Sequence, residues 1–208
     1  MPDIISLDLA GTLIDFYYFD YVWNEAIPQL CAQQQGWNIQ RAKQWVLQEY
    51  AQIGTNDLRW YLPEYWFDRF KLHEDPDQIF QTHTDKIRVY PDAIPTLQQL
   101  HQHHSLILSS GVPRNIQRII LEQFPPVFSE TFSSTTDMQE PKKSTRFYHN
   151  ICRTMAVAPV SVLHCGDDWQ TDVVAPQTIG ITCYLLDRTA QKQGPQILTR
   201  LDELLTLG

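Results

Sequence analysis

A carboxylate at the end of an apolar segment constrains the fold of this chain more than any other feature. Residues 4–8 read Ile-Ile-Ser-Leu-Asp, a short apolar run that is typical of a buried parallel strand. Gly11 follows shortly afterwards and indicates a turn. Open α/β sheets bind their ligands at the carboxyl ends of their strands, where Asp8 would lie. The simplest alternative is that Asp8 only caps the turn after the strand.

The composition favours a protein that buries one ordinary core. Of the 208 residues, 43% are hydrophobic and 19% are charged, which is typical of a globular protein. The net charge of −8 argues against partners that require a basic surface, namely nucleic acids and anionic membranes. Because no apolar run is long enough to span a membrane and no basic leader begins the chain, we expect a cytoplasmic protein. Buried free thiols are expected for the four widely spaced cysteines, Cys31, Cys152, Cys165 and Cys183.

Two later segments repeat the pattern of a strand that ends in polar residues. Residues 105–109 are predicted to form a strand that runs into Ser109, Ser110 and Gly111, before a helix over residues 113–123. A hydroxyl beside a helix N-terminus can bind phosphate, since side-chain and backbone donors converge there. Residues 160–165 are predicted to form a second such strand, which leads into Gly166 and Asp167.

Residues 16–88 change from strand to helical periodicity and are rich in aromatic side chains. Gly36, Gly54 and Pro63 divide this region into three or four predicted helices. Packing within a small helical core is the expected role of most of the aromatic residues. Those at positions 16–21, which follow Asp8 closely, are the better candidates for a substrate pocket. The histidines at 101, 103 and 104 are expected to end a helix rather than bind metal, because no matched acid accompanies them.

The order Asp-Leu-Ala-Gly-Thr-Leu at residues 8–13 resembles the first motif of the haloacid dehalogenase superfamily, whose usual form is D-x-D-G-T-[LV]. The resemblance implies that Asp8 is a nucleophile and that Thr12 contacts the substrate. Ala10 stands where the family usually has a second aspartate that acts as general acid and base. The backbone carbonyl of that residue also binds Mg²⁺ in the family, and alanine retains it.

Three further motifs extend the resemblance along the chain. Ser109, Ser110 and Gly111 match the second motif, which implies contacts with the phosphoryl group. The third motif is a lysine before a helix, and counting back from Tyr148 selects Lys142. The resemblance implies that this lysine is catalytic and binds the substrate, because its ammonium would neutralise the nucleophile and the phosphoryl oxygens. The adjacent Lys143 is an alternative, and both could be solvated loop residues. The segment Gly-Asp-x-x-x-x-Asp at residues 166–172 matches the fourth motif. This match implies that Asp167 binds Mg²⁺ beside Asp8 and that Asp172 supports the site.

The family resemblance also implies an architecture. We expect an α/β fold with a Rossmann-like parallel sheet core formed by residues 1–15 and 89–208, and an inserted helical C1 cap at residues 16–88. Residues 90–92, Tyr-Pro-Asp, resemble the Tyr-Pro-Gly segment with which such a cap returns to its core. An amphipathic helix with apolar positions between Ile197 and Leu205 is expected to close the chain.

The expected activity is that of a Mg²⁺-dependent phosphohydrolase that forms an aspartyl phosphate on Asp8 and acts on a small phosphorylated metabolite. Because Ala10 removes the acid and base, turnover is expected to be slow or limited to good leaving groups. A phosphonoacetaldehyde hydrolase-like enzyme is an alternative, since such enzymes share the Asp-x-Ala-Gly-Thr form and use a cap lysine, for which Lys43, Lys71 and Lys86 are available. A binding module with reduced catalysis is another, whereas a dehalogenase fits less well because of the metal-site acids. The substrate and the oligomeric state are left open.

Overall fold

A parallel sheet of six strands forms the centre of the computed structural model, which describes residues 2–207. The strand order is β3-β2-β1-β4-β5-β6, and all neighbouring strands are parallel. The predicted α/β class with a Rossmann-like sheet is therefore confirmed. Since β1 lies in the middle, its carboxyl end is at the centre of the ligand-binding edge. The strands are β1 (Ile4–Leu7), β2 (Ser105–Ser110), β3 (Phe128–Ser133), β4 (Val162–Gly166), β5 (Thr182–Leu186) and β6 (Ile197–Leu198).

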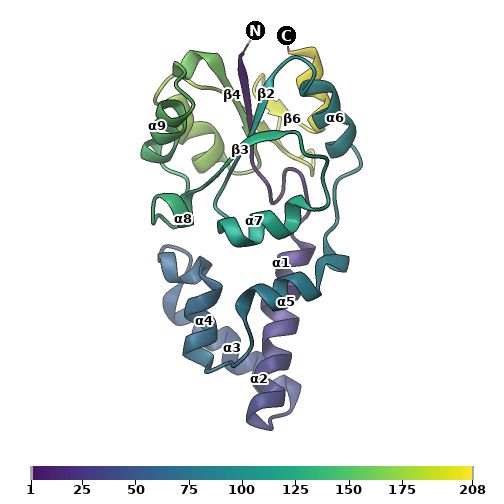
Figure 1. Ribbon diagram of the computed structural model, residues 1–208, viewed down its shortest axis with the longest axis vertical. Coiled ribbons are helices and arrows are strands. Elements are labelled where there is room, and N and C mark those ends of the chain that lie inside the picture. The colour runs from purple at the N-terminus through teal and green to yellow at the C-terminus, as the bar shows by residue number, and fades with distance from the viewer. Residues whose placement is uncertain (1, 208) are drawn as a thin grey trace.

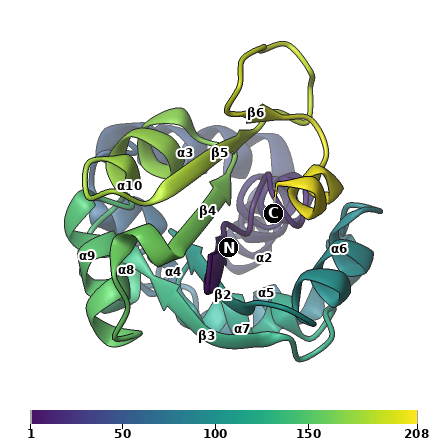
Figure 2. The same cartoon turned by 90° about the horizontal axis from the view of Figure 1, so that it is seen from above.

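Alternate residues of the central strand face two separate apolar layers. Ile5 and Leu7 of β1 pack into one layer, and Ile4 packs into the other, as the two-residue period of a strand requires. Figure 2 shows α6 and α7 on one side of the sheet and α9 and α10 on the other. Because both faces are covered, the apolar character of β1 is explained. The helices around the sheet are α6 (Ala93–Leu100), α7 (Arg114–Leu121), α8 (Ser134–Asp137), α9 (Thr145–Thr154) and α10 (Ala175–Gln177).

Between β1 and α6 the chain forms a helical lobe, residues 17–86, which lies beyond the carboxyl ends of the strands (Figure 1). The chain enters and leaves the lobe through two adjacent segments. The N–H of Asp15 donates to the carbonyl of Arg88, and the N–H of Tyr90 donates to the carbonyl of Leu13, both at 3.0 Å. These bonds hold the two connections side by side. The lobe contains α1 (Tyr17–Tyr21), a π-helical segment (Val22–Ala26), α2 (Ile27–Gln35), α3 (Ile39–Ile53), α4 (Pro63–Phe70) and α5 (Pro76–Thr82).

Aromatic side chains fill the interior of the helical lobe. The Trp66 and Phe70 side chains are fully buried, and the rings of Tyr50 and Trp66 meet edge to face with centroids 4.6 Å apart. Most of the aromatic residues of the lobe thus pack a small core, as expected. No helix among residues 2–207 combines the length and the apolar character needed to cross a membrane. The four cysteines are buried and free, as predicted.

The predicted C-terminal helix is wrong in its first part. Ile197 and Leu198 form β6, which pairs with β5 through Leu185 and Leu186, so these apolar residues complete the sheet edge. A short 3₁₀ helix, Leu201–Thr206, follows. The helical spacing of the apolar residues therefore combined two separate elements, a buried strand and a short 3₁₀ helix. Residues 1 and 208 of the predicted core ranges lie outside the described residues.

Asp92 has a structural role at the point where the chain returns from the helical lobe. Nη1 of Arg188 donates to both carboxylate oxygens of Asp92 at 2.8 Å, and the N–H of Leu201 donates to Oδ2 at 2.8 Å. The Arg188 guanidinium also lies 3.9 Å from the ring centroid of Tyr90. The aspartate that replaces the expected glycine therefore ties the returning segment to the C-terminal part of the core.

Candidate active site

A cavity of about 610 Å³ lies between the carboxyl ends of the strands and the helical lobe. Its floor contains Asp8 and Ala10 after β1, Ser110 at the end of β2, and Asp167 after β4. These residues come from three neighbouring strands, which is why positions far apart in the sequence meet here. The cavity is the place where the structure gathers most of the polar residues that the sequence motifs single out.

Three carboxylates cluster on the cavity floor. Asp8, Asp167 and Asp172 each offer an oxygen, and these three atoms lie within 4.8 Å of one another. Burial, followed by the negative charges of Asp8 and Asp172, raises the pKa of Asp167 to about 7. Burial also raises the pKa of Asp8. Such a cluster is costly when all its members are ionised, unless cations lie beside it.

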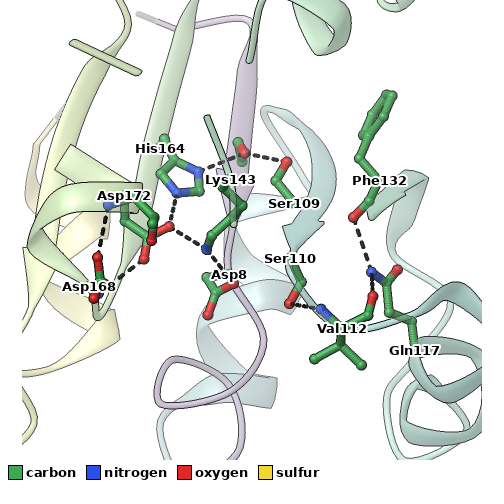
Figure 3. A network of polar contacts seen from close by, with 12 residues as sticks. Asp8, Ser109, Ser110, Val112, Gln117, Phe132, Lys143, His164, Asp168 and Asp172 are labelled. Carbon is green, nitrogen blue, oxygen red and sulfur yellow. Dashed lines mark hydrogen bonds and ion pairs between the residues drawn. The ribbon is translucent and has the colours of Figure 1, made fainter. Parts of the chain in front are cut away.

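Lys143 is the cation that lies beside these acids. Its Nζ donates to Oδ1 of Asp8 at 2.6 Å and also to Oδ1 of Asp172 (Figure 3). Burial lowers the pKa of Lys143, but the charges of Asp172 and Asp8 outweigh this and hold it above its ordinary value. For Asp172, burial raises the pKa, and Lys143 and His164 more than reverse this effect, so that it lies well below its usual range. Lys143 and Asp172 therefore form a buried ion pair.

The selection of Lys142 from the sequence is corrected by this geometry. Lys142 is exposed, and its Nζ donates to Oδ1 of Asn56 in the helical lobe at 3.0 Å. The hydroxyl of Ser144 accepts from the N–H of Phe147 and so caps α9 directly after Lys143. The lysine therefore stands one residue nearer to the helix than the count from Tyr148 assumed.

The fit of a hard divalent cation follows from the donors and charges on the floor. Three carboxylates less one ammonium leave two negative charges without a partner when all the acids are ionised. Carboxylate oxygens are the donors that Mg²⁺ prefers.

Two glycines make the close approach of the acids feasible. A Cβ at Gly11 would lie 2.3 Å from Oδ2 of Asp167, and one at Gly166 would lie 2.3 Å from Cγ of Asp172.

A buried hydrogen-bonded network supports the floor from below (Figure 3). His164 of β4 is fully buried, with Nε2 2.9 Å from Oδ1 of Asp172 and Nδ1 2.8 Å from Oγ of Ser6. The Ser6 hydroxyl donates in turn to Oγ of Ser109 at 2.8 Å. Sequence reasoning missed His164, although a polar residue inside the apolar run of β4 was a visible signal. The network joins the end of β2 to the ion pair across the central strand.

The remaining predicted residues divide into two groups. Ser110 and Gly111 line the cavity, as Ala10 does. Thr12 and Ser109 are fully buried and are not among the residues that line the cavity. No other described side chain donates to or accepts from Oγ1 of Thr12. The structure thus brings Asp8, Asp167 and Asp172 together with Lys143, and it leaves Thr12, Ser109 and Lys142 outside the cavity lining.

Comparison with known proteins gives a consistent result. A sequence model of a hydrolase family, described as haloacid dehalogenase-like hydrolase, matches residues 2–180. The chain is 23% identical over 167 residues to GMP/IMP nucleotidase YrfG of Escherichia coli, which covers 79% of this chain and 74% of that protein. It is 30% identical over 125 residues to Enolase-phosphatase E1 of Pseudomonas fluorescens, which covers 57% of this chain and 53% of that protein.

Among solved structures, a HAD phosphatase from Thermococcus onnurineus is similar, with a TM-score of 0.84. The alignment covers 100% of this chain and 97% of that one at 20% identity. At such an identity the similarity concerns the fold. It includes the helical lobe, because the whole chain is aligned.

Proposed function

Because the chain belongs to the haloacid dehalogenase-like hydrolase family, we propose that it is a Mg²⁺-dependent phosphohydrolase whose nucleophile is Asp8. The observation that carries the proposal is the cluster of Asp8, Asp167 and Asp172 with Lys143 at the carboxyl ends of the strands. The substrate would be a small phosphorylated metabolite, and a cytoplasmic location is part of the proposal. Relatives named as a nucleotidase and an enolase-phosphatase support phosphate-ester chemistry.

In the proposed reaction, a carboxylate oxygen of Asp8 attacks phosphorus and the leaving group departs with the electron pair of its bond. Water then attacks the aspartyl phosphate, which releases inorganic phosphate and restores Asp8. Lys143 holds Asp8 in place and supplies positive charge beside the phosphoryl oxygens. Mg²⁺, when bound, would neutralise charge on the phosphoryl group and the acids. Asp8, the Ala10 carbonyl and Asp167 are the proposed ligands, and Asp172 supports the site through Lys143.

We propose further that residues 16–88 act as a C1 cap on a core formed by residues 1–15 and 89–208. The lobe lies over the strand ends and supplies cavity residues such as Phe19 and Tyr50, which supports a lid that encloses the substrate. Ser110 and Gly111 line the cavity opposite this lid and are suited to contact the phosphoryl group. Thr12 and Ser109 would then act indirectly, by supporting the floor.

The phosphonatase-like alternative receives no support from the lysines of the helical lobe. Lys43 pairs with Glu25 at 2.6 Å, and Lys86 pairs with Asp85 at 2.6 Å. Lys71 pairs with Asp68 at 3.1 Å. None of the three is among the residues that line the cavity. A Schiff-base lysine would have to reach the substrate, so the phosphohydrolase proposal explains the cavity better.

Titration calorimetry with Mg²⁺ tests the metal site. We expect binding to the parent protein and a loss of at least about tenfold in affinity for Asp167→Ala, since one of few carboxylate ligands is removed. Asp202→Ala is a matched control, because Asp202 pairs with Arg200 far along the chain and does not line the cavity. Equal affinity in the parent and in Asp167→Ala would refute the assignment.

A further inference from the structure

One wall of the cavity is a single helical face that combines aromatic rings with two polar side chains. Phe16, Phe19 and Trp23 supply the rings, and Asp20 and Asn24 supply the polar groups. Their spacing of three or four residues places them on the same side of the helix. The π-helical segment, residues 22–26, lies within this wall and includes the last two of its members. The other residues of the helical lobe that line the cavity are Leu47, Tyr50, Ala51, Trp60, Tyr61 and Trp66.

The polar groups of this wall are available to a ligand. Asp20 and Asn24 are exposed, and among residues 2–207 no side-chain hydrogen bond or ion pair engages the Asp20 carboxylate or the Asn24 amide. Phe16 is 50% exposed, and its ring lies near Gly11, beside Asp167. A ring stacked on Phe16 would therefore be next to the acids of the floor, where the leaving group of a bound phosphate ester belongs.

The charges that line the cavity limit what a substrate can carry besides its phosphoryl group. Five lining residues are acids, namely Asp8, Asp20, Asp167, Asp168 and Asp172. Lys143 is the one lysine or arginine among the lining residues, and it is already paired with Asp8 and Asp172. A second anionic group on the substrate would thus approach Asp20 or Asp168 without a cation to receive it, whereas a donor or cationic group would be attracted.

The missing acid adds an independent restriction. Ala10 cannot protonate a departing oxygen, so the leaving group must depart as an anion. A phenolate is stable enough to do so, since a phenol has a pKa of about 10. Alkoxides from sugars and other alcohols are much stronger bases and depart poorly without a proton. An aromatic cavity and an absent acid therefore point to the same class of ester.

We infer, on the basis of the proposed phosphohydrolase function, that the cavity is specific for aryl phosphates whose ring carries a hydrogen-bond donor or a cation and no second anion. The bond between phosphorus and the aryl oxygen breaks as the bond from Asp8 to phosphorus forms, and the phenolate takes the electron pair. It then acquires a proton from solvent. Water releases phosphate from Asp8 in the second step, so no further reactant is needed. Asp20 and Asn24 act as specificity residues for the ring substituent.

A panel of phosphate esters tests this inference with the full-length protein and Mg²⁺. We expect kcat/KM for phenyl phosphate to exceed that for benzyl phosphate by at least about a hundredfold, because benzyl alcohol needs the missing proton. The para-aminomethylphenyl ester should exceed the para-carboxyphenyl ester by about tenfold or more. Acetyl phosphate releases acetate, which departs without a proton and has no ring to bind the aromatic wall. Its hydrolysis therefore measures phosphoryl transfer independently of the recognition of a ring. Failure to hydrolyse acetyl phosphate would count against the proposed function itself.

If acetyl phosphate is hydrolysed and the ester preferences are absent, the aryl assignment is overturned while the phosphohydrolase proposal stands. A nucleoside monophosphate or sugar phosphate with a higher kcat/KM than phenyl phosphate would also overturn it.

Asp20→Asn should reduce the preference for the aminomethyl ester over the carboxyl ester by about tenfold or more. Asp68→Asn makes the same change at an exposed acid of α4 outside the cavity and should retain the preference. Equal preferences in the two variants would contradict the role of Asp20.

Discussion

Ala10→Asp is expected to speed the hydrolysis of alkyl phosphates such as benzyl phosphate by about 10² to 10⁴, the range that general acid and base catalysis usually supplies. Ala10 and Asp8 both line the cavity, so a carboxyl group at residue 10 would share the space in which the leaving group departs. The effect on the departure of an aryl group should be small, because phenolate needs no proton. Steady-state and pre-steady-state rates for phenyl and benzyl phosphate measure the difference.

Ala10→Asn is the matched control for this substitution. It adds nearly the same volume and a polar group, but its amide cannot act as a general acid, so it should not reproduce the gain. If the parent protein has the same kcat/KM for benzyl phosphate as for phenyl phosphate, another residue supplies the proton to the leaving group. Asp168 would then be the first candidate because it lines the cavity, whereas Asp15 does not and instead accepts from the N–H of Tyr17.

Lys143→Met should abolish turnover and destabilise the metal-free protein by about 3 to 5 kcal/mol. The Lys143 side chain is only 6% exposed, and its removal leaves the carboxylates of Asp8 and Asp172 buried without a counter-charge. Loss of the ammonium also removes positive charge next to the phosphoryl group. Urea denaturation in the presence of a chelator gives the free energy of unfolding, and an acetyl phosphate assay with Mg²⁺ gives the activity.

Lys142→Met makes the same substitution one residue earlier in the chain. Lys142 is exposed and is bonded to Asn56, so the free energy of unfolding should change by no more than about 0.5 kcal/mol. Its activity should stay close to that of the parent. Similar losses in both variants, or a larger loss in Lys142→Met, would contradict the placement of Lys143 on the cavity floor.

The sequence predicted those features that depend on a short local pattern. Asp8 and Asp167 could be placed together because each directly follows an apolar strand, and the ends of neighbouring parallel strands share one edge. The helical region after β1 was predictable from its periodicity. Packing of its aromatic residues, such as Trp66, followed from the need to bury them.

Features that depend on a side-chain direction or on a distant partner could not be predicted. Lys142 and Lys143 are adjacent in the sequence, and only the folded structure shows that Lys143 reaches Asp8 while Lys142 bonds to Asn56. Ile197 lies in a strand because it pairs with Leu185 at the edge of β5. The spacing of apolar residues in the sequence does not show such a distant partner. His164 contacts Ser6 through one ring nitrogen and Asp172 through the other. Its role therefore depends on the relative positions of three segments, which the sequence alone does not give.

Mass spectrometry of acid-quenched protein during turnover of phenyl phosphate with Mg²⁺ tests most directly whether Asp8 is the nucleophile. Because Ala10 leaves water without a base, the second step should be slow and the phosphorylated protein should accumulate. We expect one phosphoryl group, mapped to the peptide that contains Asp8, together with a burst of phenol. Asp8→Asn should show neither. Two results would contradict a nucleophilic Asp8. One is turnover that produces no adduct and persists in Asp8→Asn, and the other is an adduct on another residue.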